Sequence, residues 1–335
     1  MKILLTGKNG QVGWELQRTL AILGDVVAVD RQGMDLANPD SIRNAIRTIR
    51  PDLIVNAAAY TAVDKAESEP ELAMAINGIA PGIMAEEARQ LGAAMVHYST
   101  DYVFDGTKTS PYTEEDIPNP ISVYGKTKLA GEQAVQAAGI PHLIFRTSWV
   151  YGLRGRNFLL TILRLAKERD ELKIVDDQIG APTWSRMIAE ATAIILAQCL
   201  SLPPLEIEDS GRPDRRPLLE PDDRPVPFPP FRKGGQGGFA PVLSDRGGLY
   251  HLTAAGRTSW YGFAKAILES VSPQGNNLSP LIPHPSPNLI PIATSEYPLP
   301  APRPLYSMLS SAKLNRSFGV ALPAWDASLT LCMEE

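Results

Sequence analysis

Cysteine is nearly missing from this sequence. Among its 335 residues only Cys199 and Cys332 are cysteines, and they lie far apart without the short spacing of metal ligands. A disulfide framework needs several paired cysteines, so the sequence excludes a disulfide-rich secreted scaffold and a cysteine-based metal site. We expect the protein to work in a reducing compartment.

Long apolar runs and blocks of basic residues are missing as well. The N-terminus offers one lysine and the short run Ile3–Leu5 before a glycine-rich turn, which fits neither a signal peptide nor a membrane-spanning helix. The formal net charge is -5, and no cluster of Lys and Arg provides the basic surface that a nucleic acid needs. We therefore expect a cytoplasmic globular protein with no membrane or nucleic-acid partner.

Short aliphatic runs alternate with longer helical patterns through the first half of the chain. The expected strands are Lys2–Thr6, Val26–Val29, Leu53–Asn56, Ala94–Tyr98 and His142–Arg146. The expected helices between them are Gln11–Leu23, Pro39–Ile49, Glu71–Leu91 and Ser122–Ala138. Strands separated by helices predict right-handed crossovers, so the fold class is α/β with a Rossmann-like doubly wound parallel sheet.

The second half of the chain has a less regular pattern. Its expected elements are helices at Asn157–Arg169, Thr183–Leu200, Thr258–Ser270 and Pro323–Met333 and a strand at Leu249–Leu252. We expect residues 151–335 to form mainly a smaller C-terminal substrate-binding lobe over the carboxyl edge of a sheet domain, residues 1–150. Pro203–Gly247 is rich in Pro and Gly and predicts a disordered insertion, and Ser272–Pro291 predicts a long loop.

Glycines follow the first expected strand at spacings of three residues. They are Gly7, Gly10 and Gly13, and the helix expected from Gln11 begins among them. Glycine permits a close backbone approach to a pyrophosphate, and the free N–H groups of a helix N-terminus attract its charge. A purely structural turn is the alternative, but the preceding strand and following helix favour dinucleotide binding. The expected contacts are Gly7, Asn9, Gly10, Gln11 and Val12.

The second and third expected strands end in residues that suit the same dinucleotide. Asp30 can accept hydrogen bonds from adenosine ribose hydroxyls, whereas Arg31 can receive a 2′-phosphate, so NADH and NADPH remain alternatives. Asp35 and Leu36 are placed to approach the adenine, unless they form an ordinary turn. Small residues after the third strand suit backbone that passes close to a cofactor, although packing explains them equally; they are Ala57, Ala58 and Ala59.

A threonine and a Tyr-x-x-x-Lys pair form the candidate catalytic group. Thr100 follows the fourth expected strand, at the edge where doubly wound sheets bind ligands. Tyr124 and Lys128 are one helical turn apart and share a helix face. We expect the lysine ammonium to lower the tyrosine pKa from its usual value of about 10. Thr100 would then polarise a carbonyl oxygen while Tyr124 supplies a proton and NAD(P)H a hydride. A half-buried tyrosine beside an extended lysine is the alternative.

Longer motifs make the chain resemble a known family. They are Gly7–Gly13, Asn56–Glu67, Tyr98–Gly106, Val123–Glu132, Phe145–Tyr151, Asp177–Thr183 and Arg303–Pro304. In this order they resemble the extended short-chain dehydrogenase/reductases, and within them the dTDP-4-dehydrorhamnose reductase family. The resemblance covers nearly the whole chain apart from Pro203–Gly247.

The resemblance implies a reaction and a set of substrate contacts. The reaction is reduction of the 4-keto group of dTDP-4-dehydro-L-rhamnose by NADPH or NADH, catalysed by Thr100, Tyr124 and Lys128. The implied substrate contacts are Thr61, Val63, Thr100, Asp101, Tyr102, Trp149 and Arg303. A core position is the alternative for Trp149, and a structural salt bridge is the alternative to diphosphate contact for Arg303.

The resemblance also implies a homodimer, and some members of the family hold Mg²⁺ at the dimer interface through glutamates. The corresponding glutamates in this chain would be Glu190, Glu334 and Glu335, and surface carboxylates explain all three more simply. We therefore predict no metal ligands.

Other functions are compatible with parts of the sequence. A sugar-nucleotide dehydratase carries Asp-Glu after the threonine, and Tyr102 here replaces that glutamate, which disfavours elimination of water. An epimerase regenerates its nicotinamide, and no residue excludes that activity. A non-catalytic NADP-binding regulatory subunit and a partner-recruiting protein built on Pro203–Gly247 are further alternatives.

Overall fold

The computed structural model describes residues 1–200, 243, 246–271 and 287–335. The expected insertion Pro203–Gly247 lies outside the described residues except near its end, and so do residues 272–286 of the expected long loop. Leu243 is fully buried in the core, so folded structure begins before Gly247. No helix in these described ranges is long and apolar enough to cross a membrane.

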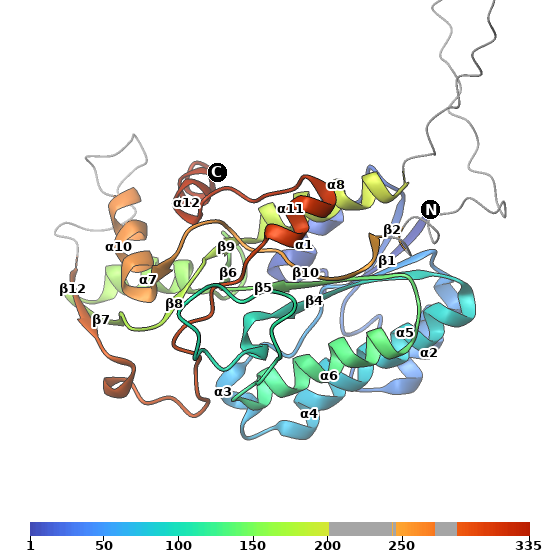
Figure 1. Ribbon diagram of the computed structural model, residues 1–335, viewed down its shortest axis with the longest axis horizontal. Helices are drawn as coiled ribbons and strands as arrows, with labels where there is room; N and C mark the ends of the chain where they lie inside the picture. The colour runs from blue at the N-terminus through green and yellow to red at the C-terminus, as the bar shows by residue number, and fades with distance from the viewer. Residues whose placement is uncertain (201–242, 244–245, 272–286) are drawn as a thin grey trace, which may run out of the picture.

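A parallel sheet forms the centre of the molecule (Figure 1). Its six strands have the order β10–β5–β4–β3–β1–β2, and every neighbouring pair is parallel. The strand order reverses between β1 and β3, which confirms the predicted Rossmann-like doubly wound sheet. The strands are β1 (Lys2–Thr6), β2 (Asp25–Val29), β3 (Leu53–Asn56), β4 (Ala94–Thr100), β5 (His142–Thr147) and β10 (Gly248–His251).

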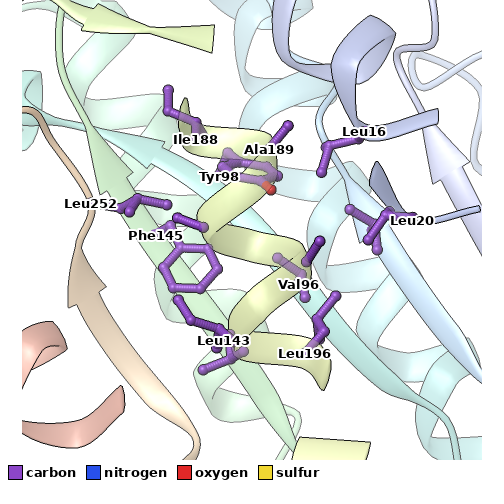
Figure 2. Packing of buried hydrophobic residues seen from close by; sticks show 14 of the residues in the cluster. Leu16, Leu20, Val96, Tyr98, Leu143, Phe145, Ile188, Ala189, Leu196 and Leu252 are labelled. Atoms are coloured by element: carbon purple, nitrogen blue, oxygen red, sulfur yellow. The ribbon is translucent and has the colours of Figure 1, made fainter. Parts of the chain in front are cut away.

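Helices α1 (Gln11–Thr19), α8 (Ser185–Leu200) and α11 (Ala312–Phe318) pack on one face of the sheet. Figure 2 shows α8 crossing in front of the β4 and β5 side chains, including Val96 and Phe145. Burial of one such large apolar side chain stabilises the fold by roughly 1.5–3 kcal/mol. This packing fixes β4, whose last residue belongs to the candidate site.

The opposite face carries α2 (Pro39–Ile49), α5 (Ala80–Leu91) and α6 (Val123–Ala137). Short elements complete this side of the molecule: α3 (Val63–Ala66), α4 (Pro70–Met74), a π-helix (Ala75–Ile79) and a 3₁₀ turn (Asp101–Val103). Side chains alternate along each strand, so Ile3 and Leu5 face α1 and α8 while Leu4 faces α2. Both faces are therefore covered, as a parallel sheet requires.

A smaller lobe lies at one end of the sheet (Figure 1). Its core includes Tyr151, Ile162, Phe263 and Leu329. Its helices are α7 (Phe158–Glu168), α10 (Trp260–Ser270) and α12 (Trp325–Met333). Its strand pairs are β6 (Val150–Tyr151) with β9 (Thr183–Trp184), β7 (Glu171–Val175) with β12 (Asn288–Ile292), and β8 (Ile179–Gly180) with β11 (Thr258–Ser259).

Some predictions about the second half of the chain are wrong. The segments Thr183–Leu200 and Leu249–Leu252 were expected in the smaller lobe, but α8 and β10 belong to the central sheet and its covering layer. The end of the expected loop Ser272–Pro291 is β12, which pairs in parallel with β7. A proline such as Pro291 is tolerated in β12 because the pair has only two strands, so each strand has a free edge.

Candidate active site

The glycine turn joins β1 to α1 in the predicted way. Gly7 has φ +74°, and a Cβ at Gly13 would lie 2.1 Å from the Gly7 carbonyl oxygen, so a side chain fits neither position. Gly10 is the N-cap of α1, and no side chain caps this helix. The first N–H groups of α1 therefore remain free to bind an anion such as a pyrophosphate.

Several residues expected to contact the dinucleotide are packed or hydrogen-bonded within the protein. Gln11 is tied to the smaller lobe, because Asn157 Nδ2 donates to its Oε1 at 2.8 Å. Val12 packs against the sheet core, and the side chain of Leu36 is buried in the core beside α2, so it faces away from a ligand. Small residues after β3 allow close packing, since a Cβ on Gly7 would lie 2.8 Å from the Ala58 nitrogen.

The acidic and basic residues after β2 pair with one another. Asp30 Oδ2 lies 3.1 Å from Lys8 Nζ, a contact that the sequence did not indicate. Asp35 Oδ1 lies 3.6 Å from Arg31 Nε, and the Arg31 side chain is 81% exposed. Arg31 therefore remains accessible to a ligand, whereas Asp30 is already engaged.

Thr100, Tyr124 and Lys128 converge at the carboxyl end of β4. Thr100 is the last residue of β4, and it lies close enough to Tyr124 to influence the pKa of its phenol. Helix α6 starts beside this point because Ser122 caps it, its hydroxyl accepting from the Gly125 N–H at 3.1 Å. Only β3 separates β4 from β1, so Thr100 and the glycine turn lie about 10 Å apart along the same edge.

The expected effect of Lys128 on Tyr124 is wrong. Burial raises the pKa of Tyr124 to about 12, although the hydrogen bond from Thr100 opposes the shift. Lys128 is not among the groups that shift it, and its ammonium donates to the Tyr98 carbonyl oxygen at 2.6 Å. The phenol is consequently protonated at neutral pH, which is the state that a proton donor in a reduction must have.

Lys128 itself is a buried cation. Its residue is 2% exposed, and burial lowers the pKa of Lys128 to about 8, with Glu132 opposing the shift. Glu132 is mainly committed to Arg146, whose Nη2 lies 2.7 Å from Glu132 Oε2. An ammonium with this pKa is mostly charged at neutral pH and loses its charge in mild alkali.

Asp101 and Tyr102 border the catalytic group. Asp101 Oδ1 accepts from the Thr100 hydroxyl at 3.0 Å, and burial raises the pKa of Asp101 to about 6. The rings of Tyr102 and Tyr124 meet edge to face with centroids 5.5 Å apart. The edge-to-face contact restrains the Tyr124 ring from one side.

We predict that Asp101→Asn stabilises the protein at neutral pH. Because the pKa of Asp101 is higher in the folded protein than in the unfolded chain, the neutral carboxyl favours folding at low pH. This stabilisation is lost as the pH rises through about 6, where the buried carboxyl becomes charged. Removing the buried charge should raise the free energy of unfolding by roughly 2–3 kcal/mol at pH 8 and hardly change it near pH 3. Urea unfolding at both pH values measures the difference; equal effects at the two values would contradict the titration of Asp101.

The remaining expected substrate residues lie around this edge. Thr61 is exposed and Val63 is half-buried, just after β3. Trp149 has an unusual φ of +47°, and its ring stacks on Trp260 with centroids 3.6 Å apart, so one of its faces is covered. Arg303 follows the salt-bridge alternative, because its Nη2 donates to Asp64 Oδ2 at 2.8 Å.

The three glutamates that could correspond to Mg²⁺ ligands do not form a common site in the structure. Glu190 and Glu334 are exposed, and the Glu335 carboxylate contacts the guanidinium of Arg186, which repels a metal cation. Within the described ranges, no group of three or more His, Cys, Asp or Glu residues could hold a metal ion.

Two residues that hold helix α6 in position could not be identified from the sequence alone. Asn77 lies in the π-helix, and its side chain accepts from the Tyr60 N–H at 2.8 Å and donates to the Tyr60 carbonyl at 3.1 Å and to Thr127 Oγ1 at 3.2 Å. Glu67 accepts from the Val123 N–H at 2.9 Å, at the first residue of α6. The acidic motif after β3 contains Glu67, but only the fold brings it to α6.

We predict that Asn77→Ala weakens the catalytic helix. Asn77 is 1% exposed, so its loss leaves the Tyr60 N–H and carbonyl without this partner and removes one of two hydrogen bonds of the Thr127 hydroxyl, at a cost of roughly 2–4 kcal/mol of unfolding free energy. Because Thr127 lies between Tyr124 and Lys128, kcat should fall as well. Thermal unfolding and steady-state kinetics measure both effects. Asn315→Ala, on the exposed side of α11, is the control and should change the unfolding free energy by less than about 0.5 kcal/mol.

A family model described as the RmlD substrate binding domain matches residues 1–205 and 241–335 of this chain. The chain belongs to the RmlD family. The match leaves out residues 206–240, which form most of the expected insertion Pro203–Gly247.

Full-length relatives agree with this membership. A dTDP-4-dehydrorhamnose reductase of Burkholderia thailandensis is 45% identical over 339 residues, which cover 100% of this chain and 99% of that protein. The crystal structure of a dTDP-4-dehydrorhamnose reductase from Clostridium acetobutylicum superposes with a TM-score of 0.79 at 34% identity, covering 100% of this chain and 99% of that one. The corresponding Bacillus anthracis protein, in complex with NADP, gives 0.78 at 30% identity and covers 99% and 98% of the two chains.

Proposed function

We propose that this RmlD-family chain is a dTDP-4-dehydrorhamnose reductase. It would use NAD(P)H to reduce the 4-keto group of dTDP-4-dehydro-L-rhamnose and form dTDP-L-rhamnose. The proximity of Thr100 to the protonated phenol of Tyr124, at the ligand-binding edge of the sheet, carries the proposal. The full-length relatives of the same name support it.

The residues at this edge fit a nicotinamide dinucleotide. The turn from Gly7 to Gly13 leaves room for backbone contact with a pyrophosphate, and the uncapped N-terminus of α1 supplies donors. Ala57–Ala59 would contact the cofactor through backbone, and Lys128 would bind its nicotinamide ribose. When bound, the reduced nicotinamide supplies a hydride to the keto carbon.

The catalytic residues act on the keto oxygen. The Thr100 hydroxyl, which donates to Asp101 Oδ1 in the structure, would turn to donate to this oxygen as negative charge develops on it. Tyr124 then transfers its proton, which its raised pKa keeps in place until that moment. Lys128, one helical turn along α6, would hold the nicotinamide ribose beside Tyr124; its ammonium donates to the Tyr98 carbonyl oxygen at 2.6 Å.

Sugar and diphosphate contacts are proposed for the residues that border this group. Asp101 and Tyr102 flank the keto site, and Thr61 and Val63 follow β3 at the same edge. Trp149, which is half-buried, would contact the sugar with the part of its ring that Trp260 and Gly180 do not cover. Arg303 would bind the diphosphate with the N–H donors that Asp64 does not use. The ion pair between Arg303 and Asp64 would remain in place.

We propose further that residues 1–150 bind the dinucleotide, and that the smaller lobe within residues 151–335 completes the sugar site that residues at the edge of the sheet begin. A cytoplasmic homodimer is part of the same proposal and follows from the family resemblance. The net charge of -5 disfavours a nucleic-acid partner. Sedimentation equilibrium of the purified chain tests the dimer.

A coupled assay tests the proposed function. The protein is incubated with dTDP-4-dehydro-6-deoxyglucose, its 3,5-epimerase and NADPH or NADH, and nicotinamide absorbance and products are followed. We expect stoichiometric consumption of reduced cofactor with formation of dTDP-L-rhamnose. A changed sugar without net cofactor consumption would indicate an epimerase, and an unchanged sugar a binding protein.

A further inference from the structure

Trp149 is held in an unusual backbone conformation. Its φ of +47° lies in the left-handed region, where a bulky residue is strained. A residue keeps such a conformation only when its surroundings fix it, and strained residues concentrate at ligand sites. The Thr183 N–H donates to the Trp149 carbonyl oxygen at 3.2 Å, and the Ser148 hydroxyl donates to the Ala181 carbonyl oxygen at 2.9 Å. The end of the motif Asp177–Thr183 therefore fixes the backbone around Trp149.

The ring of Trp149 lies in a narrow slot between Trp260 and Gly180. It stacks on the Trp260 ring, with the two planes 4° apart and the centroids 3.6 Å apart. A Cβ at Gly180 would lie 2.4 Å from Cε2 of Trp149 and 2.7 Å from both Cζ2 and Nε1. Because Cε2 is bonded to the other two atoms, this Cβ would stand over a face of the ring. Trp260 covers one face and Gly180 the other, so no side chain fits at Gly180 while Trp149 keeps its position.

The same motif holds Trp260, the first residue of α10. Gln178 Oε1 accepts from Trp260 Nε1 at 3.1 Å, and Gln178 Nε2 donates to Thr294 Oγ1 at 3.1 Å. Gln178 is buried, and both ends of its amide are engaged, so turning the amide would leave polar atoms unpaired. The Thr294 N–H in turn donates to the Asp177 carboxylate at 2.9 Å. Gln178 thereby fixes the indole on which Trp149 stacks.

We propose that the motif Asp177–Thr183 positions the Trp149 ring for sugar binding. Gln178, acting through Trp260, and Gly180 are the positioning residues, and they leave the edge of the Trp149 ring for the sugar. The edge of an aromatic ring is electropositive, so it favours hydroxyl oxygens, whereas a ring face would favour C–H groups. A ring that is fixed before binding loses little conformational freedom when the sugar arrives. This inference rests on the proposed function, because it takes Trp149 as a sugar contact.

Two ligands separate recognition of the sugar from recognition of the nucleotide. Isothermal titration compares dTDP-L-rhamnose with dTDP on the full-length wild type and on Gly180→Ala, each saturated with NADP⁺. The added methyl group must displace the Trp149 ring, so we expect about tenfold weaker binding of dTDP-L-rhamnose and less than about twofold change for dTDP. Trp260→Ala removes the support on the other face and should act in the same way. Trp260→Phe keeps an aromatic ring and should recover most of the affinity.

Circular dichroism reports the slot without any ligand. Two stacked indoles couple their electronic transitions, so the wild type should give an exciton couplet in the far ultraviolet. Gly180→Ala and Gln178→Met should weaken this couplet, because each allows one of the two rings to move. Gly92→Ala is the control for lost stability, since Gly92 has φ +67° and a Cβ there meets no atom within 4 Å. It should keep the couplet and both affinities.

The ratio of the two affinities decides the inference. An unchanged ratio in Gly180→Ala would overturn it, and so would an equal change of the ratio in Gly92→Ala. If the wild type binds dTDP-L-rhamnose no more tightly than dTDP, Trp149 adds nothing to sugar recognition and the inference alone fails. A wild type that binds neither ligand would overturn the proposed substrate as well.

Discussion

Replacing Tyr124 by phenylalanine is expected to lower kcat by about 10²–10⁴-fold, because the variant has no proton to give to the developing alkoxide. The ring and its edge-to-face contact with Tyr102 remain, so the fold should change little. Burial holds the phenol protonated, and Thr100 lies close enough to influence its pKa, so the phenol is the proton donor that the site supports. Steady-state kinetics with the sugar nucleotide and reduced cofactor measure the loss.

Cofactor affinity separates a catalytic role of Tyr124 from a structural one. Tyr124→Phe should bind NADP⁺ within about threefold of wild type, since a neutral hydroxyl contributes about 1 kcal/mol or less to binding. Tyr297→Phe, at a half-exposed tyrosine away from the catalytic helix, is the matched control and should keep full activity. Reduction by Tyr124→Phe at the wild-type rate would contradict the assignment.

Replacing Lys128 by methionine is expected to cost about 10²-fold or more in kcat/KM, since the site loses its buried cation. Methionine fills a similar volume, and the Tyr98 carbonyl loses its donor. Lys126→Met, two positions earlier and exposed on the same helix, is the matched control. It should have nearly wild-type kinetics, and an equal loss in both variants would contradict a specific role for Lys128.

The pKa of Lys128 gives this prediction a pH dependence. Burial lowers that pKa to about 8, so the ammonium is present below this pH and is lost above it. The affinity of the free enzyme for NADP⁺ should therefore fall as pH rises through about 8. The titratable neighbours are Glu132 on α6, which opposes the shift, and His97 on β4, which is neutral in this pH range because burial lowers its pKa. In Lys128→Met, the affinity for NADP⁺ should no longer fall as the pH rises through about 8.

Elements with clear local signals could be predicted to the residue. The strand Lys2–Thr6 and the helix Pro39–Ile49 have the predicted bounds. The helix is marked in sequence by Asn38, whose side chain accepts from the N–H groups of Asp40 and Ser41, and by proline at its first position. The helix expected to run to Leu23 ends instead at Thr19, because apolar residues beyond that point do not by themselves require a helix.

Partnerships between distant segments could not be predicted. The sequence does not indicate that β10 extends the central sheet or that β12 pairs with β7, because strand pairing depends on the whole fold. Asn77 reaches Thr127 across 50 residues, and no local pattern announces that contact. The candidate catalytic residues could be predicted because their signals are local. Tyr124 and Lys128 form a Tyr-x-x-x-Lys motif, and Thr100 follows a recognisable strand.

Electrostatic consequences were the least predictable part of the site. The Tyr-x-x-x-Lys spacing places both side chains on one face, but burial and the Tyr98 carbonyl decide their charges. Likewise Asp30 and Arg31 left the cofactor undecided in sequence, and the ion pair between Lys8 and Asp30 was not visible in it. Such effects follow from distances and solvent exposure, which a sequence does not contain.

Isotope transfer tests most directly whether the chain reduces a sugar ketone at this site. The protein is incubated with the epimerised 4-keto sugar nucleotide and NADPH that carries deuterium at the transferable nicotinamide position, and the product is analysed by mass spectrometry and NMR. A single deuterium on C4 of dTDP-L-rhamnose, with Tyr124→Phe giving almost none, is the expected result. An unlabelled sugar product, or label returned to the cofactor, would contradict the account.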